Sequence, residues 1–415
     1  MWRTKNFLLK GFTLFFLALF LLTQGFGASS KVQIRFTFWG GKEEKTAYEA
    51  MIKAFNDSQN EIEVIPVHIP DMYEEKVLTM IGAGDVPDII AIGGAHIPAF
   101  AARGALSSLD NYISRINTAA YYRKALDAMY WDKKLYGLPF RMNTKLMAYN
   151  LDMLNEAGIQ PPSPGKAWTP EEYLANAKKL TIPGKRWGSG FPWWNQWLYQ
   201  FGGRVLDREG KRCMLNRPEA LESLKYVYDL VWVHGAAPKP EETGGMGPID
   251  MFMAEKVAMF CDVGPYFMPI LTKITKFKWG LALQPGKGNF GGSGEMEVVG
   301  LAIPAKAPNP EAAFTAITFL TADPRAQDIL ALTKTQIPGS KRSGSLFAKQ
   351  FPGAELFIKA IDLQEPQFKS PDSRAIGRVL DELRDSVLTS FNPKSPEVAL
   401  KEACEKINKI LKGGE

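Results

Sequence analysis

The fold of this chain is decided by residues 32–44, which read Val-Gln-Ile-Arg-Phe-Thr-Phe-Trp-Gly-Gly-Lys-Glu-Glu. Apolar and polar side chains alternate through this stretch, which predicts a β-strand with one buried face. Two glycines follow, and then a helix with acidic residues in its first turn, where they favour the helix dipole. Strand, glycine turn and helix open a doubly wound α/β unit, in which ligands bind beyond the carboxyl ends of the strands. We therefore expect a ligand-binding edge here, formed by Trp39, Gly41, Lys42 and Glu43.

The same pattern recurs further along the chain. An apolar strand at residues 89–92 again ends in two glycines, Gly93 and Gly94, and His96 follows them. A single histidine after a strand is often a helix cap or a surface residue, and that alternative stays open here. The repeated geometry nevertheless predicts that Gly94 and His96 share the edge that carries Trp39.

Residues 136–149 are expected to form two strands that run between two halves of the molecule. The first contains a proline, and it places Arg141 and Asn143 on one side. About 385 residues remain after the leader, and a chain of that length is usually divided between two hydrophobic cores. We therefore expect a crossover between two lobes at this point.

Four of the ten tryptophans lie within residues 184–203. Trp194, Trp197 and Phe201 are spaced at i, i+3 and i+7, so they can share one buried helix face. Trp193 lies about 100° further round, near the start of that helix, where its ring can stand at the rim of a cleft. A flat apolar ring with polar neighbours suits the C–H face of a sugar. The alternative is that all the rings simply pack in the core.

The first 27 residues are typical of an export signal, with a basic start, an apolar run from Phe12 to Leu22, and small residues at Gly25 and Gly27. Cleavage is expected after Gly27 or Ala28; an uncleaved anchor helix is the alternative. No cysteine follows the apolar run, so we expect no lipid attachment and a soluble periplasmic or secreted protein.

Several classes of function find little support in the sequence. A formal net charge of +6, spread evenly, does not favour nucleic acid as a partner. The three cysteines, Cys213, Cys261 and Cys404, suggest neither a disulfide framework nor a zinc site, and Cys404 is expected to be a buried thiol. Triad, zincin and nucleotide-loop motifs are missing, so we expect no catalytic residue, no bound metal and no cofactor.

Two weaker patterns in the sequence resemble enzyme motifs. Residues 286–291 match GxGxxG, but a strand follows them instead of a helix, so we reject a dinucleotide site. Glu295 and Glu297 lie on one face of that strand and could form a carboxylate pair for glycosidic cleavage, although a solvated strand edge is the simpler interpretation. Residues 291–295 are interpreted as flexible chain that returns between the lobes, and residues 337–342 as a basic turn.

Taken in order, these motifs resemble the extracellular solute-binding proteins of carbohydrate ABC importers, the maltodextrin-binding class. The matching pieces extend over nearly the whole mature chain. They include Phe38-Trp39-Gly40, Gly84-Asp85-Val86-Pro87-Asp88, Tyr136-Gly137-Leu138-Pro139, Trp168-Thr169-Pro170-Glu171-Glu172-Tyr173, Gly202-Gly203 and Gly264-Pro265.

The resemblance implies an α/β, periplasmic-binding-protein-like fold of type II, with two doubly wound lobes, a hinge and an interlobe cleft. On this basis the signal peptide is residues 1–27, lobe 1 is 28–142 plus about 295–345, and lobe 2 is 143–294 plus about 346–415. Asn143 matches a sugar-contacting position, Trp193 a stacking position, and Tyr266 replaces the usual tryptophan. The remaining expected ligand contacts are Arg141, Trp194, Gly292, Glu295 and Arg374.

In the position of a further stacking residue near the C-terminus, the chain offers Ser373 or Arg374 instead of an aromatic ring. This departure favours a smaller sugar, a polyol or a charged derivative over an extended oligosaccharide. The leading hypothesis is a monomeric, non-enzymatic carrier that delivers such a solute to the membrane permease of an ABC importer. The alternatives are a secreted carbohydrate-active enzyme and a binder of phosphorylated polyols or of peptides, the latter if Arg141, Lys341 or Arg342 points into the cleft.

Overall fold

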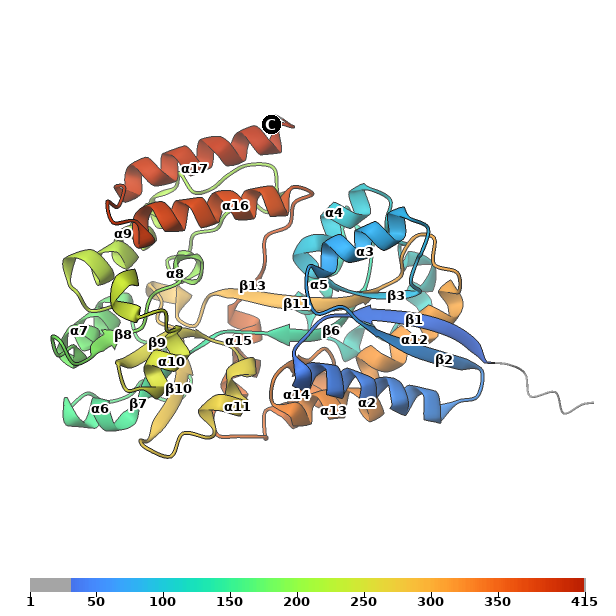
Figure 1. The fold of residues 1–415 in the computed structure, drawn as a ribbon, viewed down its shortest axis with the longest axis horizontal. Coiled ribbons are helices and arrows are strands. Elements are labelled where there is room, and N and C mark those ends of the chain that lie inside the picture. Colours follow the sequence, from blue (N-terminus) through green and yellow to red (C-terminus); the bar gives the residue numbers. More distant parts are fainter. Residues whose placement is uncertain (1–30, 414–415) are drawn as a thin grey trace, which may run out of the picture.

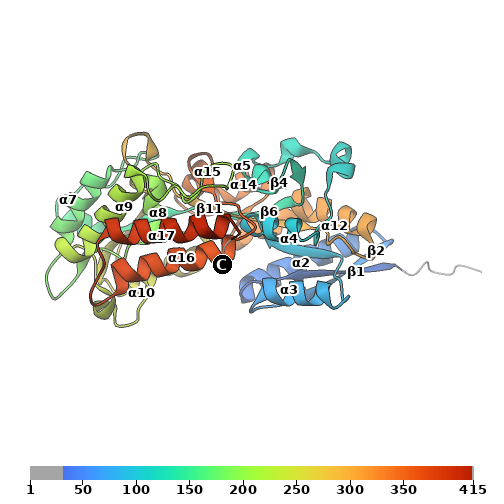
Figure 2. The same ribbon diagram turned by 90° about the horizontal axis from the view of Figure 1, so that it is seen from above.

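The computed structural model describes residues 31–413. The expected signal peptide, with its cleavage site, lies outside the described residues. The elements separate into two halves, each built on its own sheet (Figure 1). Seen from above, the halves lie side by side along the long axis (Figure 2). The mixed α/β fold with two lobes is therefore confirmed.

The larger sheet belongs to the half that contains the first strand. Its strand order is β12-β6-β11-β3-β1-β2, with β13 paired to β11 off this path. The strands are β1 (Val32–Phe38), β2 (Ile62–His68), β3 (Ile89–Gly93), β6 (Leu138–Asn143), β11 (Glu295–Ala302), β12 (Ile337–Pro338) and β13 (Glu365–Pro366). β1 runs parallel to β2 and β3, whereas β11 runs antiparallel to both β3 and β6.

The turn after β1 shows why glycines are needed there. Gly40 has a φ of +139°, and a Cβ atom at this position would collide with the Glu44 side chain. The amide of Gly41 donates to the Glu44 carboxylate at 2.9 Å, which satisfies one of the free amides at the start of α2 (Lys42–Ser58). Tyr48 and Phe55 on α2 are buried against the sheet, as the sequence predicts.

Further helices cover this sheet. They are α3 (Tyr73–Gly82), α4 (Ile97–Ala102), α5 (Arg123–Ala128), α12 (Pro310–Ala322), α13 (Pro324–Thr333) and α14 (Lys341–Phe347), together with the hairpin β4 (Tyr130–Trp131) and β5 (Lys134–Leu135). The expected basic turn at 337–342 is wrong, because these residues form β12 and the start of α14.

The smaller sheet has the order β10-β7-β9-β8. Its strands are β7 (Leu146–Asn150), β8 (Trp187–Ser189), β9 (Val257–Val263) and β10 (Trp279–Leu283). The helices of this half are α6 (Leu151–Glu156), α7 (Pro170–Leu180), α8 (Trp194–Gln200), α9 (Pro218–Tyr228), α10 (Pro248–Met253), α11 (Met268–Leu271), α16 (Ser373–Arg384) and α17 (Pro396–Leu411). The capping box of α7, in which Thr169 and Glu172 bind each other's backbone amides, follows from its sequence.

The chain passes between the sheets three times, through residues 143–146, 283–295 and 363–373. The buried side chain of Gln364, in the third passage, binds the other two. Its amide nitrogen donates to the carbonyl oxygens of Lys145 at 2.6 Å and of Gly292 at 3.2 Å, and its oxygen accepts from the Lys145 amide at 2.9 Å. α15 (Ala354–Leu363) leads into the third passage. The bonds made by Gln364 hold the crossings in register.

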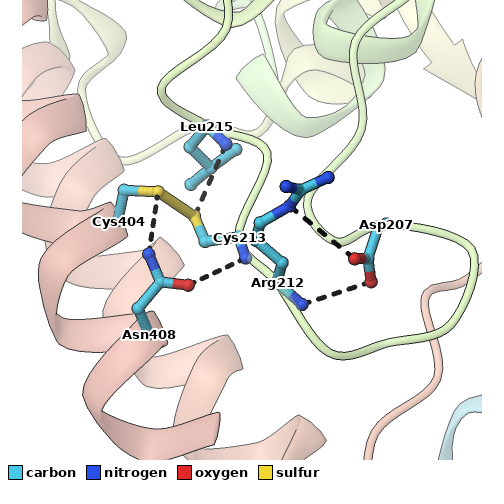
Figure 3. The surroundings of a disulfide bond; sticks show 6 residues. All are labelled: Asp207, Arg212, Cys213, Leu215, Cys404 and Asn408. Atoms are coloured by element: carbon cyan, nitrogen blue, oxygen red, sulfur yellow. Dashed lines mark hydrogen bonds and ion pairs between the residues drawn. A yellow bond between two sulfur atoms is a disulfide. The ribbon is translucent and has the colours of Figure 1, made fainter.

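The expectation that the cysteines form no disulfide is wrong. Cys213 and Cys404 are 191 residues apart in sequence, yet they form a disulfide with a Cα–Cα distance of 5.7 Å (Figure 3). The bond joins the loop after α8 to the closing helix α17, and Asn408 of that helix also accepts from the Cys213 amide at 3.0 Å. Cys404 is buried as expected, but as half of a cross-link. Cys261 is a free thiol.

Candidate functional site

A cavity of about 470 Å³ lies between the two halves. The loop after β3 contributes Ala95 and His96, and β11 contributes Glu295. On the opposite side stand α8 and α16, with Phe368 of the third crossing between them. A larger cavity of about 890 Å³ adjoins it and shares Tyr199 and Phe368, but its other walls are the β4–β5 hairpin and the loop at 204–211. The smaller cavity is therefore the one that brings strand-end residues of the first half together with the tryptophan stretch.

Trp193 stands at the N-cap of α8, where the backbone is still extended, with a φ of −82° and a ψ of 106°. Its side chain keeps 37% of its surface exposed. By contrast, Trp194 and Trp197 are buried, and the Trp194 indole donates to the Ser223 hydroxyl at 3.1 Å. The helix therefore buries one aromatic face in the core and leaves the exposed indole ring of Trp193 at the cavity, as its spacing predicts.

Most charged side chains that line the cavity are paired. Arg374 contacts Glu75 at 2.7 Å, and Arg384 contacts Asp381 at 3.0 Å. The guanidinium of Arg384 also lies over the Trp193 ring, 5.6 Å from its centroid. His96 lies 3.8 Å from a carboxylate oxygen of Glu74. The charges of α16 and of the loop after β3 are thus largely compensated by other protein groups.

Glu295 differs from these residues. Among residues 31–413, no lysine, arginine or histidine nitrogen lies within 4 Å of its carboxylate. Its oxygen accepts from the Asn195 amide group at 3.4 Å, and its backbone amide donates to Gln196 at 3.0 Å. Burial disfavours the charged form and raises the pKa of Glu295 to about 7. The carboxylate therefore changes its charge close to neutral pH.

A polar network continues from Glu295 along the same face of β11. The Glu297 carboxylate accepts from Asn143 at 2.7 Å and from Arg141 at 3.4 Å. Burial opposes its charge, but Arg141 outweighs burial, so the pKa of Glu297 is lowered. Arg141 also donates to Gln336 at 3.1 Å and lies 5.3 Å from the centre of the Trp39 ring. Within residues 31–413, the buried oxygen Oδ1 of the Asn143 side chain has no hydrogen-bond partner, so its capacity as an acceptor is unused there.

Lys145 follows this network on the first crossing. Its ammonium donates to the Tyr266 hydroxyl at 2.8 Å and lies 4.7 Å from the centre of that ring. Asp262 is 3.8 Å away on the other side. Burial opposes the charge of Lys145, but Asp262 and Tyr266 outweigh it and raise its pKa. The ammonium of Lys145, on the first crossing, thus holds the aromatic ring of Tyr266 in place.

The predicted site residues fall into four places. His96, Trp193, Trp194, Glu295 and Arg374 line the cavity. Trp39, Arg141, Asn143 and Tyr266 belong to the neighbouring polar network. Gly41, Lys42 and Glu43 are exposed at the start of α2. Gly94 and Gly292 are buried: Gly94 packs against Ala128, and the backbone of Gly292 is hydrogen-bonded to Gln284 and Gln364.

Several residues of the site were not predicted from the sequence. They are Glu75, Lys145, Asn195, Asp262, Gln336, Phe368 and Arg384. Lys145 carried a usable signal, because it comes two residues after Asn143 at the predicted crossing. Gln336 and Arg384 carried none, since their roles depend on segments that meet only in the folded chain.

Two α/β halves joined by three crossings, with a cavity between them, define the class of type II periplasmic binding proteins. The family model described as "Bacterial extracellular solute-binding protein" matches residues 39–327. Because this match covers more than half of the chain, the protein belongs to that family. No helix among residues 31–413 is long and apolar enough to cross a membrane.

Known proteins of this class are similar over most of the chain. A maltotriose-binding protein of Pyrococcus abyssi is 24% identical over 386 residues, which cover 89% of this chain and 80% of the relative. An ABC substrate-binding protein of Listeria monocytogenes, solved with cycloalternan, superposes with a TM-score of 0.81 at 24% identity, covering 93% of this chain and all of that one. The sugar-binding protein MalE of Xanthomonas citri gives 0.80 at 23% identity, with 92% and 98% covered. These likenesses agree in fold.

Proposed function

We propose that this protein is a non-enzymatic carrier that captures a carbohydrate-like solute between its lobes and passes it to the membrane permease of an ABC importer. The observation that carries the proposal is the exposed indole of Trp193 at a cavity whose polar side chains come from both halves. Aromatic rings bind the C–H faces of sugars, and polar groups replace the water that the hydroxyls lose. The maltotriose and cycloalternan proteins support this assignment by similarity.

The mechanism we propose is a shift between open and closed forms. A solute that touches both halves binds the closed form more tightly, and only that difference in affinity drives closure. Lobe 1 would comprise residues 28–142 plus about 295–345, and lobe 2 residues 143–294 plus about 346–415. The passages tied by Gln364 would serve as the hinge. Export through a cleaved leader and a monomeric state belong to the same proposal.

A panel of neutral mono-, di- and trisaccharides and polyols, measured by thermal shift and then by calorimetry, tests the assignment. A ligand that binds only the folded protein raises its melting temperature with concentration. We expect at least one saccharide to raise it, and the effect to be lost in Trp193→Ala. A panel without any binder, or binding that survives the loss of the indole, would refute this site.

A secreted carbohydrate-active enzyme is the second candidate, because Glu295 and Glu297 share one strand face and the pKa of Glu295 lies near 7. Glu297, however, is held by Arg141 and Asn143, which leaves it poorly placed as a free nucleophile or base. Incubation with a panel of glycosides decides between the two. Product formation that stops in Glu295→Gln would establish the enzyme, and we expect none.

A further inference from the structure

The charged residues that line the cavity indicate which kind of sugar it would bind. Five lining residues carry or can carry a charge, namely His96, Glu295, Arg374, Asp381 and Arg384. Four of them have an oppositely charged or chargeable partner within 4 Å. Glu295 has none among residues 31–413. The cavity therefore presents one carboxylate that has no cation in direct contact among the described residues, with Lys145 acting on its charge only from a greater distance.

Cations that could favour an anionic solute are already paired: in the cavity itself, Arg374 with Glu75 and Arg384 with Asp381. Arg141 is held by Glu297 and Gln336, and Arg342 by Asp328 at 3.0 Å. Lys341 donates to the carbonyl oxygen of Ala119 at 3.2 Å. A phosphate or carboxylate on the ligand would have to displace one of these partners and would also face Glu295. An anionic derivative is thus disfavoured by the arrangement of charges.

A cationic group on the ligand would meet the opposite situation. Desolvating a carboxylate without a cationic partner is costly, and an ammonium placed beside it offsets that cost while forming a charge-assisted hydrogen bond. Phe368 and the exposed Trp193 line the same cavity, so the carbon skeleton of a sugar has apolar surface nearby. The buried, unpartnered oxygen of Asn143 adds a further acceptor to the adjoining network.

We propose that Glu295 recognises a cationic amino group, so that the preferred solute is an amino sugar rather than a neutral or phosphorylated one. This inference rests on the proposed function, since it assigns the substrate class of the same cavity. The raised pKa of Glu295 adds a measurable consequence: near pH 7 part of the protein population carries a proton there, and an incoming ammonium expels it.

Matched sugar pairs test the proposal by calorimetry at pH 7. The probes are glucose with glucosamine, galactose with galactosamine, mannose with mannosamine, and cellotriose with the glucosamine trimer. In whichever skeleton binds, we expect the amine to bind at least tenfold more tightly than its hydroxyl counterpart, with the advantage shrinking in high salt. In buffers of different ionisation enthalpy, binding of the amine should release protons and binding of the neutral sugar should not.

Glu295→Gln should abolish both the preference and the proton release, so that an amine and its hydroxyl counterpart bind the variant with affinities within about twofold of each other. Asp381→Asn is the matched control, because Asp381 lines the same cavity but is already paired with Arg384, and it should keep the preference. Neutral sugars that bind as tightly as their amines to the unaltered protein would overturn the inference and leave the carrier function standing. Equal losses for both sugars in Glu295→Gln would also overturn it. If neither class of sugar binds, both proposals fall.

Discussion

Arg374 Nη2 lies 2.7 Å from Glu75 Oε1, and this ion pair joins α16 to α3 across the cavity. Both side chains are about half exposed, so the pair should contribute only about 0.2–1 kcal/mol, and salt should weaken it. Its position matters more than its strength. A contact that joins the two halves at the rim of the cavity favours the arrangement in which they are close.

We therefore expect Arg374→Gln to weaken ligand binding about two- to fivefold, an effect on the order of 1 kcal/mol or less, with little change in the melting temperature of the free protein. Glu75→Gln should have the same effect, and the double variant should be no worse than either. Arg342→Gln, whose partner Asp328 lies in the same half, is the control. Additive losses in the double variant would show that the two residues act separately.

Trp193→Ala should weaken binding of the solute at least tenfold, because truncating the ring removes apolar contact on the order of 1–3 kcal/mol. Its unfolding free energy should stay close to that of the natural protein, since the ring is partly exposed. Trp197→Ala provides the contrast: that ring is fully buried, and its loss should destabilise the fold by about 3–5 kcal/mol. Calorimetry and urea unfolding separate the two effects.

Glu295 should make stability depend on pH. Its pKa is raised from 4.5 to about 7 in the folded protein because burial disfavours the carboxylate. Between these two pH values the folded state binds more protons than the unfolded state, so stability should fall as the pH rises through that window. Below pH 4.5 the Glu295 carboxyl group does not lower the unfolding free energy, and above about pH 7 it lowers the unfolding free energy by the full amount. Urea unfolding from pH 4 to 8 should show a flatter profile for Glu295→Gln, and an unchanged profile would contradict the burial of this charge.

Arg141 should be sensitive to replacement because it is buried and compensates Glu297. Arg141→Met leaves that carboxylate without its cation and should lower the unfolding free energy, though by less than the about 3–5 kcal/mol of a fully buried pair, because the Glu297 side chain keeps 35% of its surface exposed. Adding Glu297→Gln removes the unpaired negative charge and should restore most of the lost unfolding free energy. A double variant that is as unstable as the single one would mean that Arg141 acts through packing instead.

The disulfide between Cys213 and Cys404 should stabilise the protein by about 2–4 kcal/mol, mainly by restricting the unfolded chain. A reducing agent should therefore lower the melting temperature of the natural protein, and the Cys213→Ala/Cys404→Ala variant should melt low with or without it. Cys261→Ala removes a thiol but no cross-link, so it should keep the response to reduction. A natural protein that melts identically in both conditions would contradict a stabilising bond.

Local patterns account for what could be predicted from the sequence. The alternation before Trp39, the cap at Thr169 and the spacing of Trp194 and Trp197 each act within one turn or one strand, and the structure confirms all of these elements. The aromatic positions near the cavity followed from the same local rules, since the phase of α8 decides which ring is left at its start.

Long-range contacts account for what could not be predicted. Cys213 meets Cys404 only because α17 returns to the loop after α8, and nothing within either segment indicates that return. The same holds for the ion pair between Arg374 and Glu75, because Glu75 lies almost three hundred residues earlier in the chain. Strand β12 was missed, and a basic turn was predicted at 337–342 instead, because this strand exists only through its pairing with β6.

The placement of β11 has a consequence for biosynthesis. This strand, residues 295–302, lies between β3 and β6, both of which are complete by residue 143. A nascent chain that has been made only as far as residue 294 thus carries two facing strands whose shared neighbour does not yet exist. The amino-terminal half must wait for the last third of translation before its sheet can close, and fragments that end earlier expose open β edges to self-association.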